Sequence, residues 1–151
     1  MEHAALKKME IRIARKEDSE SISELMRELG YKTSVDLIRE KIGEVVQSDI
    51  DQVFVAVIDN QVVGCVSCHL TQLFHQKGRA GRITSLVVLK NYRNTGIGTR
   101  LVKAADHFFQ SNGCSGAEVT SGDHRKEAHD FYQNQGYKLD ERRFIKHYNR
   151  Y

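Results

Sequence analysis

Apolar residues recur along the chain in two periods, one typical of strands and one typical of helices. Ile11 and Ile13 alternate with polar residues, whereas Ile22, Leu25 and Leu29 lie three or four residues apart. In the first half of the chain these patterns predict a strand over residues 11–14, a helix capped at Asp18 or Ser19 that stops at Gly30, a helix that starts near Thr33 or Ser34, and strands over residues 52–58 and 62–70. The short polar segment between the last two strands favours an antiparallel hairpin.

In the second half, strand patterns and helix patterns alternate. They predict strands over residues 82–89, 117–121 and 137–148 and helices over residues 98–111 and 125–135. Such alternation favours a parallel pair of strands joined by a crossover helix. We therefore expect a single domain over residues 1–151 with a mixed α/β (α+β) fold. Its sheet, antiparallel early and parallel late, is flanked by helices in the order β-α-α-β-β-β-α-β-α-β.

The composition is that of an ordinary globular protein. Hydrophobic residues make up 40% of the 151 residues and charged residues 28%, so neither disorder nor a fibrous repeat is indicated. The formal net charge of +3 is too small to indicate a nucleic-acid partner. No apolar run reaches the roughly 18 residues of a membrane span, and the first residues lack the apolar core of a secretory signal. We expect a cytoplasmic protein with no membrane partner.

Cys65, Cys68 and Cys114 are an odd number of cysteines in a chain without an evident export signal, which argues for reduced thiols. The run from Cys65 to His69 matches the C-x-x-C-H pattern of covalent haem attachment. It lies within a predicted strand, where residues an odd number apart point to opposite faces. We therefore interpret Cys65 and Cys68 as buried apolar residues and expect no haem or metal site.

A strand, a turn and a helix join in the segment from residue 83 to residue 102. Gly96 and Gly98 lack Cβ atoms, so the backbone there can approach a ligand closely. The first turn of the following helix leaves backbone N–H groups without helical partners, and with the helix dipole these groups favour a phosphate. Arg93 and Arg100 are candidates for charge-assisted hydrogen bonds to the same anion. Because a lone G-x-G is common in ordinary turns, its context decides the interpretation.

Two motifs in this half follow the patterns of one enzyme family. Arg93, Gly96 and Gly98 fit the pattern Arg or Gln, two residues, Gly, one residue, Gly or Ala, and residues 128–137 fit A-x-x-x-Y-x-x-x-G-F/Y. With these motifs, and in its order of elements over roughly residues 10–148, the chain resembles the GNAT family of N-acetyltransferases. The resemblance implies an enzyme with acetyl-CoA as cosubstrate that acetylates a primary amine of a small molecule or peptide by direct attack.

The resemblance also implies where the cofactor binds. Backbone amides from Asn94 to Thr99 would hold the CoA pyrophosphate, and Leu86 to Val88 would pair with pantetheine as with an added strand, where the parallel strands after residues 83 and 117 part. The implied cofactor-binding residues are Leu86, Val87, Val88, Arg93, Asn94, Thr95, Gly96, Ile97, Gly98, Thr99 and Arg125. Arg125 departs from the family pattern, because many relatives have an asparagine there that contacts the cofactor.

Tyr132 is the candidate catalytic residue. The resemblance places it at the family's general-acid tyrosine, which protonates the departing CoA thiolate. The alternative is that Phe131 and Tyr132 are ordinary core aromatics. The oxyanion that forms on attack would accept a hydrogen bond from a strand N–H such as that of Val87 or Val88.

The residue that accepts the proton of the amine is open. Many family members carry a glutamate just before the Leu-Val-Val stretch, where this chain has Thr84 and Ser85, and neither hydroxyl is a good base. Glu118, Asp123, His124 or a chain of waters could serve instead. An imidazole has the most suitable ordinary pKa of these groups, about 6.5.

The resemblance implies an acceptor site built from the first two helices and the final strands, where acidic residues in and after the second helix would attract a cationic amine. They are Asp36, Glu40, Glu44, Asp49 and Asp51. We expect an amine-bearing substrate, with a small molecule favoured, and the sequence is compatible with a homodimer. Three alternatives stay open: an acetyltransferase for protein or peptide amines, a CoA-binding regulatory module that has lost catalysis, and an enzyme for charged tRNA, which would need a concentrated basic patch.

Overall fold

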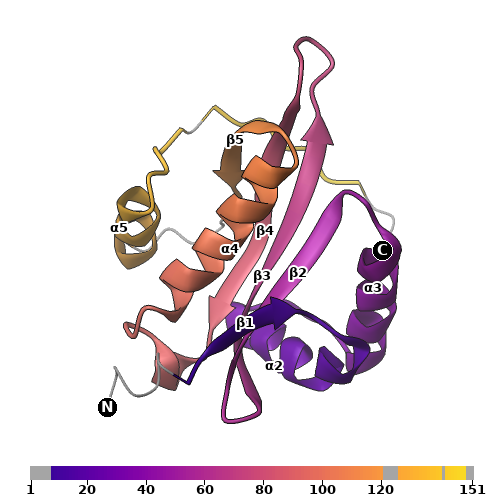
Figure 1. Cartoon of the computed structure of the whole chain (residues 1–151), viewed down its shortest axis with the longest axis vertical. Coiled ribbons are helices and arrows are strands. Elements are labelled where there is room, and N and C mark those ends of the chain that lie inside the picture. Colours follow the sequence, from indigo (N-terminus) through magenta and orange to yellow (C-terminus); the bar gives the residue numbers. More distant parts are fainter. Residues whose placement is uncertain (1–7, 121–125, 141, 149–151) are drawn as a thin grey trace.

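The computed structural model describes residues 8–120, 126–140 and 142–148 of the chain. Its elements are β1 (Glu10–Ile13), η1 (Lys16–Asp18), α2 (Ser19–Leu29), α3 (Val35–Gln47), β2 (Asp51–Ile58), β3 (Gln61–Gln72), β4 (Arg79–Val88), η2 (Lys90–Tyr92), α4 (Ile97–Ser111), β5 (Cys114–Val119) and α5 (Lys126–Asn134), as Figure 1 shows. The short elements η1 and η2 are 3-10 helices. The mixed α/β fold is confirmed, and the predicted order holds up to the last helix.

The five strands form one sheet in the order β1-β2-β3-β4-β5. Strands β1 to β4 pair antiparallel, whereas β5 pairs parallel with β4. Helix α4 makes the crossover between β4 and β5 and lies across one face of the sheet (Figure 1). Asp59 and Asn60 have φ angles of 49° and 64°, the left-handed backbone of a two-residue hairpin turn. The predicted hairpin and the predicted parallel pair are both confirmed.

The strand predicted over residues 137–148 is wrong for the residues that the structure describes. Residues 137–140 and 142–148 contain no strand, and the side chain of Phe144 is fully exposed. An alternating pattern shows which residues suit a strand, but a strand forms only where a neighbour supplies backbone hydrogen bonds. Tyr137 packs against Tyr132 instead and donates a hydrogen bond to Asp106 at 3.2 Å.

Buried apolar residues form two clusters, one on each face of the sheet. Cys68 belongs to the cluster that contains Leu101 of α4, and Cys65 belongs to the cluster that contains Leu25 of α2 and Ile42 of α3. The two cysteines therefore point to opposite faces, as expected, and both are free thiols. Burial raises the pKa of each thiol to about 12, so neither is a thiolate at neutral pH.

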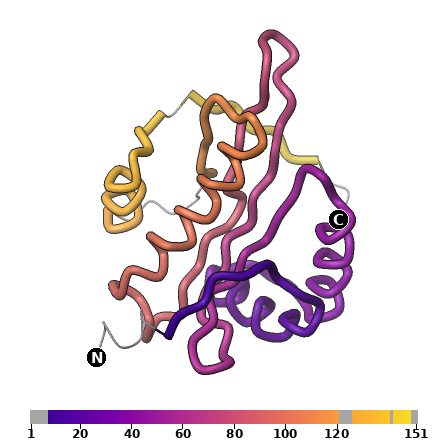
Figure 2. Tube along the Cα trace, in the orientation of Figure 1, coloured from indigo at the N-terminus to yellow at the C-terminus, as the bar shows by residue number. Residues whose placement is uncertain are grey.

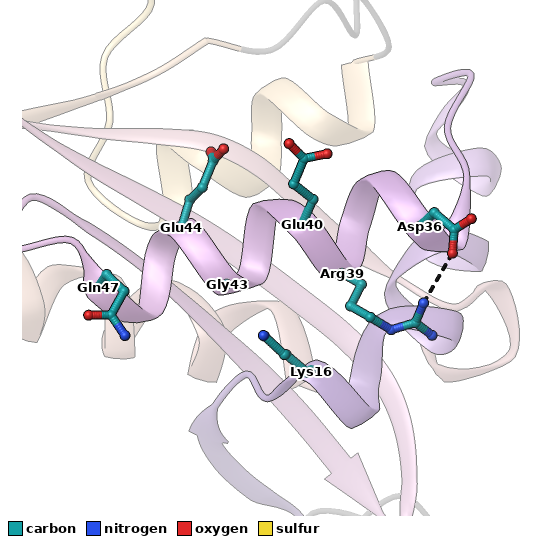
Figure 3. Close-up of a pocket in the computed structure, with 7 residues that line it drawn as sticks. All are labelled: Lys16, Asp36, Arg39, Glu40, Gly43, Glu44 and Gln47. Atoms are coloured by element: carbon teal, nitrogen blue, oxygen red, sulfur yellow. Dashed lines mark hydrogen bonds and ion pairs between the residues drawn. The ribbon is translucent and has the colours of Figure 1, made fainter.

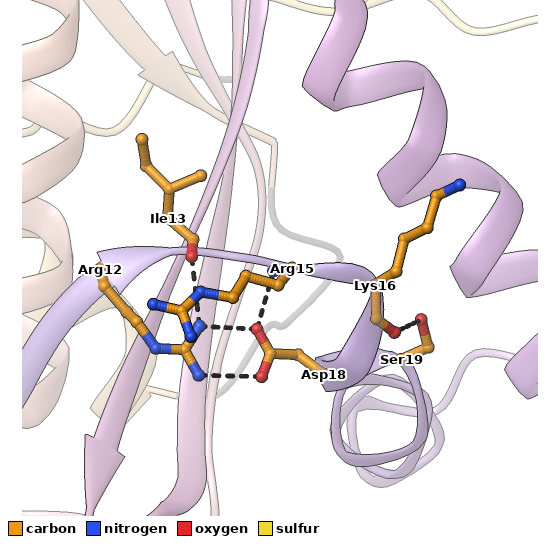
Figure 4. Close-up of polar contacts among 6 residues, drawn as sticks. All are labelled: Arg12, Ile13, Arg15, Lys16, Asp18 and Ser19. Atoms are coloured by element: carbon orange, nitrogen blue, oxygen red, sulfur yellow. Dashed lines mark hydrogen bonds and ion pairs between the residues drawn. The ribbon is translucent and has the colours of Figure 1, made fainter.

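A buried carboxylate ties the start of α2 to β1 (Figure 4). Arg12 donates two hydrogen bonds to Asp18, with Nη1 2.7 Å from Oδ2 and Nη2 2.9 Å from Oδ1, and the backbone N–H of Arg15 donates a third at 2.8 Å. Burial alone raises the pKa of Asp18, but the hydrogen bonds and the positive charges outweigh it and hold that pKa below its usual value. The pair fixes α2 against the sheet.

Candidate active site

Strand β4 has two strand neighbours along its first half and one along its second half. From Arg79 to Ile83 it pairs with both β3 and β5, whereas from Thr84 to Val88 its strand partner among the described residues is β3 alone. A cavity of about 730 Å³ is lined by this open part of β4 and by the ends of α2 and β5. Its lining residues are Glu28, Leu29, Gly30, Tyr31, Ile83, Thr84, Ser85, Leu86, Lys90, Arg93, Val119, Thr120 and Tyr132. The parallel strands thus part after Ile83.

Arg93 shows which backbone groups face the open side of β4. Its Nε donates a hydrogen bond to the carbonyl of Val88 at 3.0 Å, so that carbonyl points away from β3. Along an antiparallel strand, backbone groups of alternate residues face alternate sides. Leu86 therefore also faces the open side, whereas Val87 is paired with Cys65. The N–H and carbonyl of Val87 therefore face β3, and its side chain is buried, so Leu86 and Val88 present the backbone groups of the open side.

The turn after β4 has a backbone geometry suited to an anion. Asn94 and Gly96 have φ angles of 62° and 90°, whereas Thr95 between them is not left-handed. A backbone that alternates in hand turns successive N–H groups toward one concave side. The Thr95 hydroxyl donates to the carbonyl of Tyr92 and closes the turn. The first turn of α4 carries no acidic residue, so no negative charge competes with an anion there.

Gly98 makes room for α5. A Cβ atom at this position would lie 3.1 Å from the ring of Phe131, closer than an ordinary contact. At the end of α5, Gln135 Nε2 donates a hydrogen bond to Thr99 Oγ1 at 3.0 Å. Helix α5 is therefore docked beside the start of α4 (Figure 2). The sequence interpretation assigned Gly98 to ligand approach, and the structure adds this packing role.

Helix α5 places Tyr132 in the lining of the cavity. Its half-buried ring makes edge contacts with Phe131 and Tyr137, at centre distances of 5.3 Å and 6.3 Å. Tyr132 is thus a packed aromatic and a cavity residue at once. Burial and the nearby Asp106 raise the pKa of Tyr137 well above its usual value, so the Tyr137 hydroxyl keeps its proton and acts as a structural donor.

Glu28, at the end of α2, is a cavity residue that sequence reasoning missed. Its Oε1 accepts hydrogen bonds from the backbone N–H of Lys90 at 3.1 Å and from Arg93 Nη2 at 3.4 Å. These contacts join α2 to the turn that follows β4, and they hold the Arg93 side chain over the end of the strand. No periodic pattern signals this role, because it depends on how two elements 62 residues apart meet.

The acidic residues expected to attract an amine lie elsewhere. Asp36, Glu40 and Glu44 line a different surface depression, of about 880 Å³, together with Lys16 (Figure 3). None of the three lines the cavity beside β4. Among the described residues, the carboxylate in the lining of that cavity is Glu28.

One of the proton acceptors considered from the sequence lies within the described residues. Glu118 accepts a hydrogen bond from Arg82 Nε at 2.8 Å, so its carboxylate is held in an ion pair. Asp123 and His124 lie outside the described residues, as does the predicted cofactor contact Arg125. Of the acceptors considered from the sequence, the structure therefore places Glu118, and its carboxylate is already paired with Arg82.

Among the residues that the structure describes, no group of three or more His, Cys, Asp or Glu side chains is arranged to hold a metal ion. In those same ranges no helix has the length and apolar character required to cross a bilayer.

Comparison with known proteins gives consistent matches. The family model described as the acetyltransferase (GNAT) family matches residues 13–137. The aminoalkylphosphonate N-acetyltransferase of Salmonella typhimurium is 31% identical over 139 residues, which are 91% of this chain and 90% of the relative. Human N-alpha-acetyltransferase 30 is 35% identical over 92 residues, which are 60% of this chain but 25% of that protein.

Solved structures match the fold over nearly the whole chain. An aminoglycoside N-acetyltransferase in complex with CoA has a TM-score of 0.82 at 19% identity and covers 93% of this chain and 95% of its own. Glucosamine-6-phosphate N-acetyltransferase from Arabidopsis thaliana also has a TM-score of 0.82, at 20% identity, with 93% and 99% covered. At such identities these likenesses concern the arrangement of helices and strands.

Proposed function

The chain belongs to the GNAT family of acetyltransferases, and from this we propose that it transfers the acetyl group of acetyl-CoA to a primary amine of a small molecule. The observation that carries the proposal is the open edge of β4 beside the anion-binding turn. The edge offers backbone groups of Leu86 and Val88 to the amides of pantetheine, and residues 94–99 offer N–H groups to the pyrophosphate. Because the edge leads directly into the turn, one extended ligand can use both.

The proposed reaction is a direct attack of the free amine on the thioester carbonyl. With the pyrophosphate at the turn and pantetheine along Leu86 and Val88, the thioester lies where β4 and β5 part, near Ile83. As the C–N bond forms, an N–H group of the open edge donates to the developing oxyanion. As the C–S bond breaks, Tyr132 donates its proton to the sulfur of the departing thiolate.

A small-molecule acceptor is supported by the extent of one match. The aminoalkylphosphonate N-acetyltransferase aligns with this chain over nearly the full length of both proteins. The cavity also suits an acceptor that carries an acidic group, because Lys90 and Arg93 outnumber Glu28 among its charged lining residues. We therefore expect small amines, with or without a phosphonate, to be better acceptors than polycationic aminoglycosides.

A peptide amine is the second candidate acceptor. It is favoured by the 92-residue match to human N-alpha-acetyltransferase 30, whose name denotes acetylation of an α-amino group. That match covers a quarter of the human protein, so it supports this candidate less than the full-length match supports a small-molecule acceptor.

A thiol-release assay with acetyl-CoA and a panel of acceptors tests the proposal. The panel contains aminoalkylphosphonates, polyamines, aminoglycosides and peptides with free N-termini. We expect thiol release above the rate of thioester hydrolysis with at least one small amine, and the acetylated product by mass spectrometry. Turnover with peptides alone would select the second candidate, and CoA binding without turnover of any amine would indicate a regulatory module.

A further inference from the structure

A row of polar side chains crosses the sheet on the face that carries Cys65 and the α2 and α3 cluster. Successive register partners in β2, β3, β4 and β5 are Asp51, His69, Arg82 and Glu118. The row is divided into two pairs, Asp51 with His69 and Arg82 with Glu118. The four side chains are between 34% and 60% exposed, so water and small solutes reach them.

Asp51 orients the His69 ring. His69 Nδ1 lies 2.6 Å from Asp51 Oδ1, and Asp51 Oδ2 accepts a hydrogen bond from Ser48 Oγ at 2.9 Å. A carboxylate is an acceptor, so Nδ1 carries a proton, and in the neutral form of the ring Nε2 is the acceptor. An aspartate that fixes the tautomer of a histidine in this way prepares the ring to receive a proton.

Hydroxyl groups connect this row to the cavity. Ser67 lies two residues before His69 on the same face of β3, and its Oγ is hydrogen-bonded to Thr84 Oγ1 and to Ser85 Oγ. Thr84 and Ser85 line the cavity at the point where β4 and β5 part. A bulge brings these hydroxyls together, because Ser67 is paired with Ser85 and Cys68 with Ile83, which leaves Thr84 as an extra residue in β4.

We infer that His69 receives the proton of the acceptor amine through two hydroxyls, first that of Ser85 or Thr84, each of which is hydrogen-bonded to Ser67, and then that of Ser67. Residues two apart on a strand are separated by about 7 Å, and one water molecule bridges the remaining span from Ser67 to the ring. Each hydroxyl accepts one proton and donates another, so no hydroxyl changes its net charge. The inference rests on the acetyl transfer proposed above and supplies the acceptor that the missing glutamate leaves open.

In this proposal the two proton transfers use groups on opposite faces of the sheet. Tyr132 comes from α5, which packs beside α4 on one face, whereas His69 lies on the opposite face. The ammonium loses one proton to His69, and the free amine nitrogen then forms the C–N bond. As the C–S bond breaks, Tyr132 protonates the departing thiolate, and the nitrogen gives up its second proton, which restores the Tyr132 hydroxyl. The His69 imidazolium returns its proton to solvent. Asp51 is paired with the ring and stabilises the imidazolium, and the charge of Arg82, the register partner of His69 in β4, is balanced by Glu118.

The test compares His69→Gln with the unaltered enzyme across pH and across acceptors. We expect kcat/KM for a strongly basic alkylamine at neutral pH to fall about 100-fold. The loss should shrink as the pH rises, because the substrate then loses its proton to solvent. It should also shrink at neutral pH with an alkoxyamine, which is already unprotonated. Binding of acetyl-CoA, measured by calorimetry, should be unchanged.

Asp51→Asn and His107→Gln complete the design. Asp51 is a positioning residue, so Asp51→Asn should show the same dependence on acceptor basicity with a smaller loss, and it replaces His69→Gln if that variant does not fold. His107→Gln is the matched control, since His107 is an exposed histidine of α4, and this variant should have an unchanged kcat/KM. An unaltered pH profile in the folded His69 variant, or an equal loss with both acceptors, would overturn the relay. Failure of the unaltered enzyme to acetylate any amine would instead contradict the proposed function.

Discussion

The two halves of β4 differ in what surrounds their backbone. The first half, Arg79–Ile83, has a strand on each side, and α4 lies so close that a Cβ on Gly81 would be 2.4 Å from the ring of Phe109. The second half, Thr84–Val88, has β3 on one side and the cavity on the other within the described part of the chain. The change occurs at the bulge that contains Thr84.

This contrast teaches how one strand can be both the centre of the fold and a binding edge. Backbone groups that lack a strand partner need another hydrogen-bond partner. In the first half of β4, β5 supplies these hydrogen-bond partners. In the second half, the side chain of Arg93 supplies one of them, and we expect a ligand to supply others. The same sheet that stabilises the fold therefore creates the proposed site where its last pairing stops.

Gly81→Ala disturbs the packing of Arg79–Ile83 against α4 and should have the largest effect on stability. The new Cβ would clash with Phe109, whose ring is buried and cannot move aside freely, so we expect a loss of about 3 kcal/mol in the free energy of unfolding. Urea denaturation measures it. Gly116→Ala in β5 is the matched control, since no atom lies within 4 Å of its Cβ position, and it should change stability by less than about 0.5 kcal/mol.

Tyr132→Phe tests the proton transfer in the cavity beside Thr84–Val88 without changing the shape of that cavity. The ring keeps its contacts with Phe131 and Tyr137, and only the hydroxyl is lost. We expect kcat to fall about 100-fold while the affinity for acetyl-CoA changes little, because the lost proton donor acts only as the C–S bond breaks. Steady-state kinetics and calorimetry separate the two quantities. Unchanged turnover would leave Tyr132 with a packing role alone.

Arg93→Ala tests the contact between Arg93 and Val88 at the end of the second half of β4. The change removes the donor to the Val88 carbonyl and the partner of Glu28. The end of β4 is then no longer held by this side chain, and the site loses one positive charge. We expect the Kd for acetyl-CoA to rise about tenfold, with a small change in Tm. Arg39→Ala removes a similar ion pair from α3 and should leave the Kd unchanged. An unaffected Kd in both variants would remove Arg93 from the cofactor site.

What the sequence predicts well is local. Ile22 and Leu25 lie one helical turn apart, and Asp59 and Asn60 favour a left-handed turn, so α2 and the β2–β3 hairpin follow from neighbouring residues. The turn with Gly96 is equally local, which is why a motif identified it.

The rest depends on contacts between distant segments. The predicted last strand lacks a strand neighbour in the described residues, and no alternating pattern reveals that. The pairing of Asp51 with His69 requires the register of two strands, and the contact of Glu28 with Arg93 requires α2 to meet the end of β4. These side-chain contacts between distant segments were therefore found only in the structure.

Amide hydrogen exchange with and without CoA tests the central claim most directly. On its second side, the segment Thr84–Val88 has no strand neighbour among the described residues, and the cofactor is expected to supply the hydrogen-bond partners there. We expect added CoA to slow exchange at the amides of Leu86 and Val88 and across residues 94–99, and to leave the amides from Arg79 to Ile83 as they were. Saturating CoA that leaves Leu86, Val88 and the turn unprotected would contradict the account.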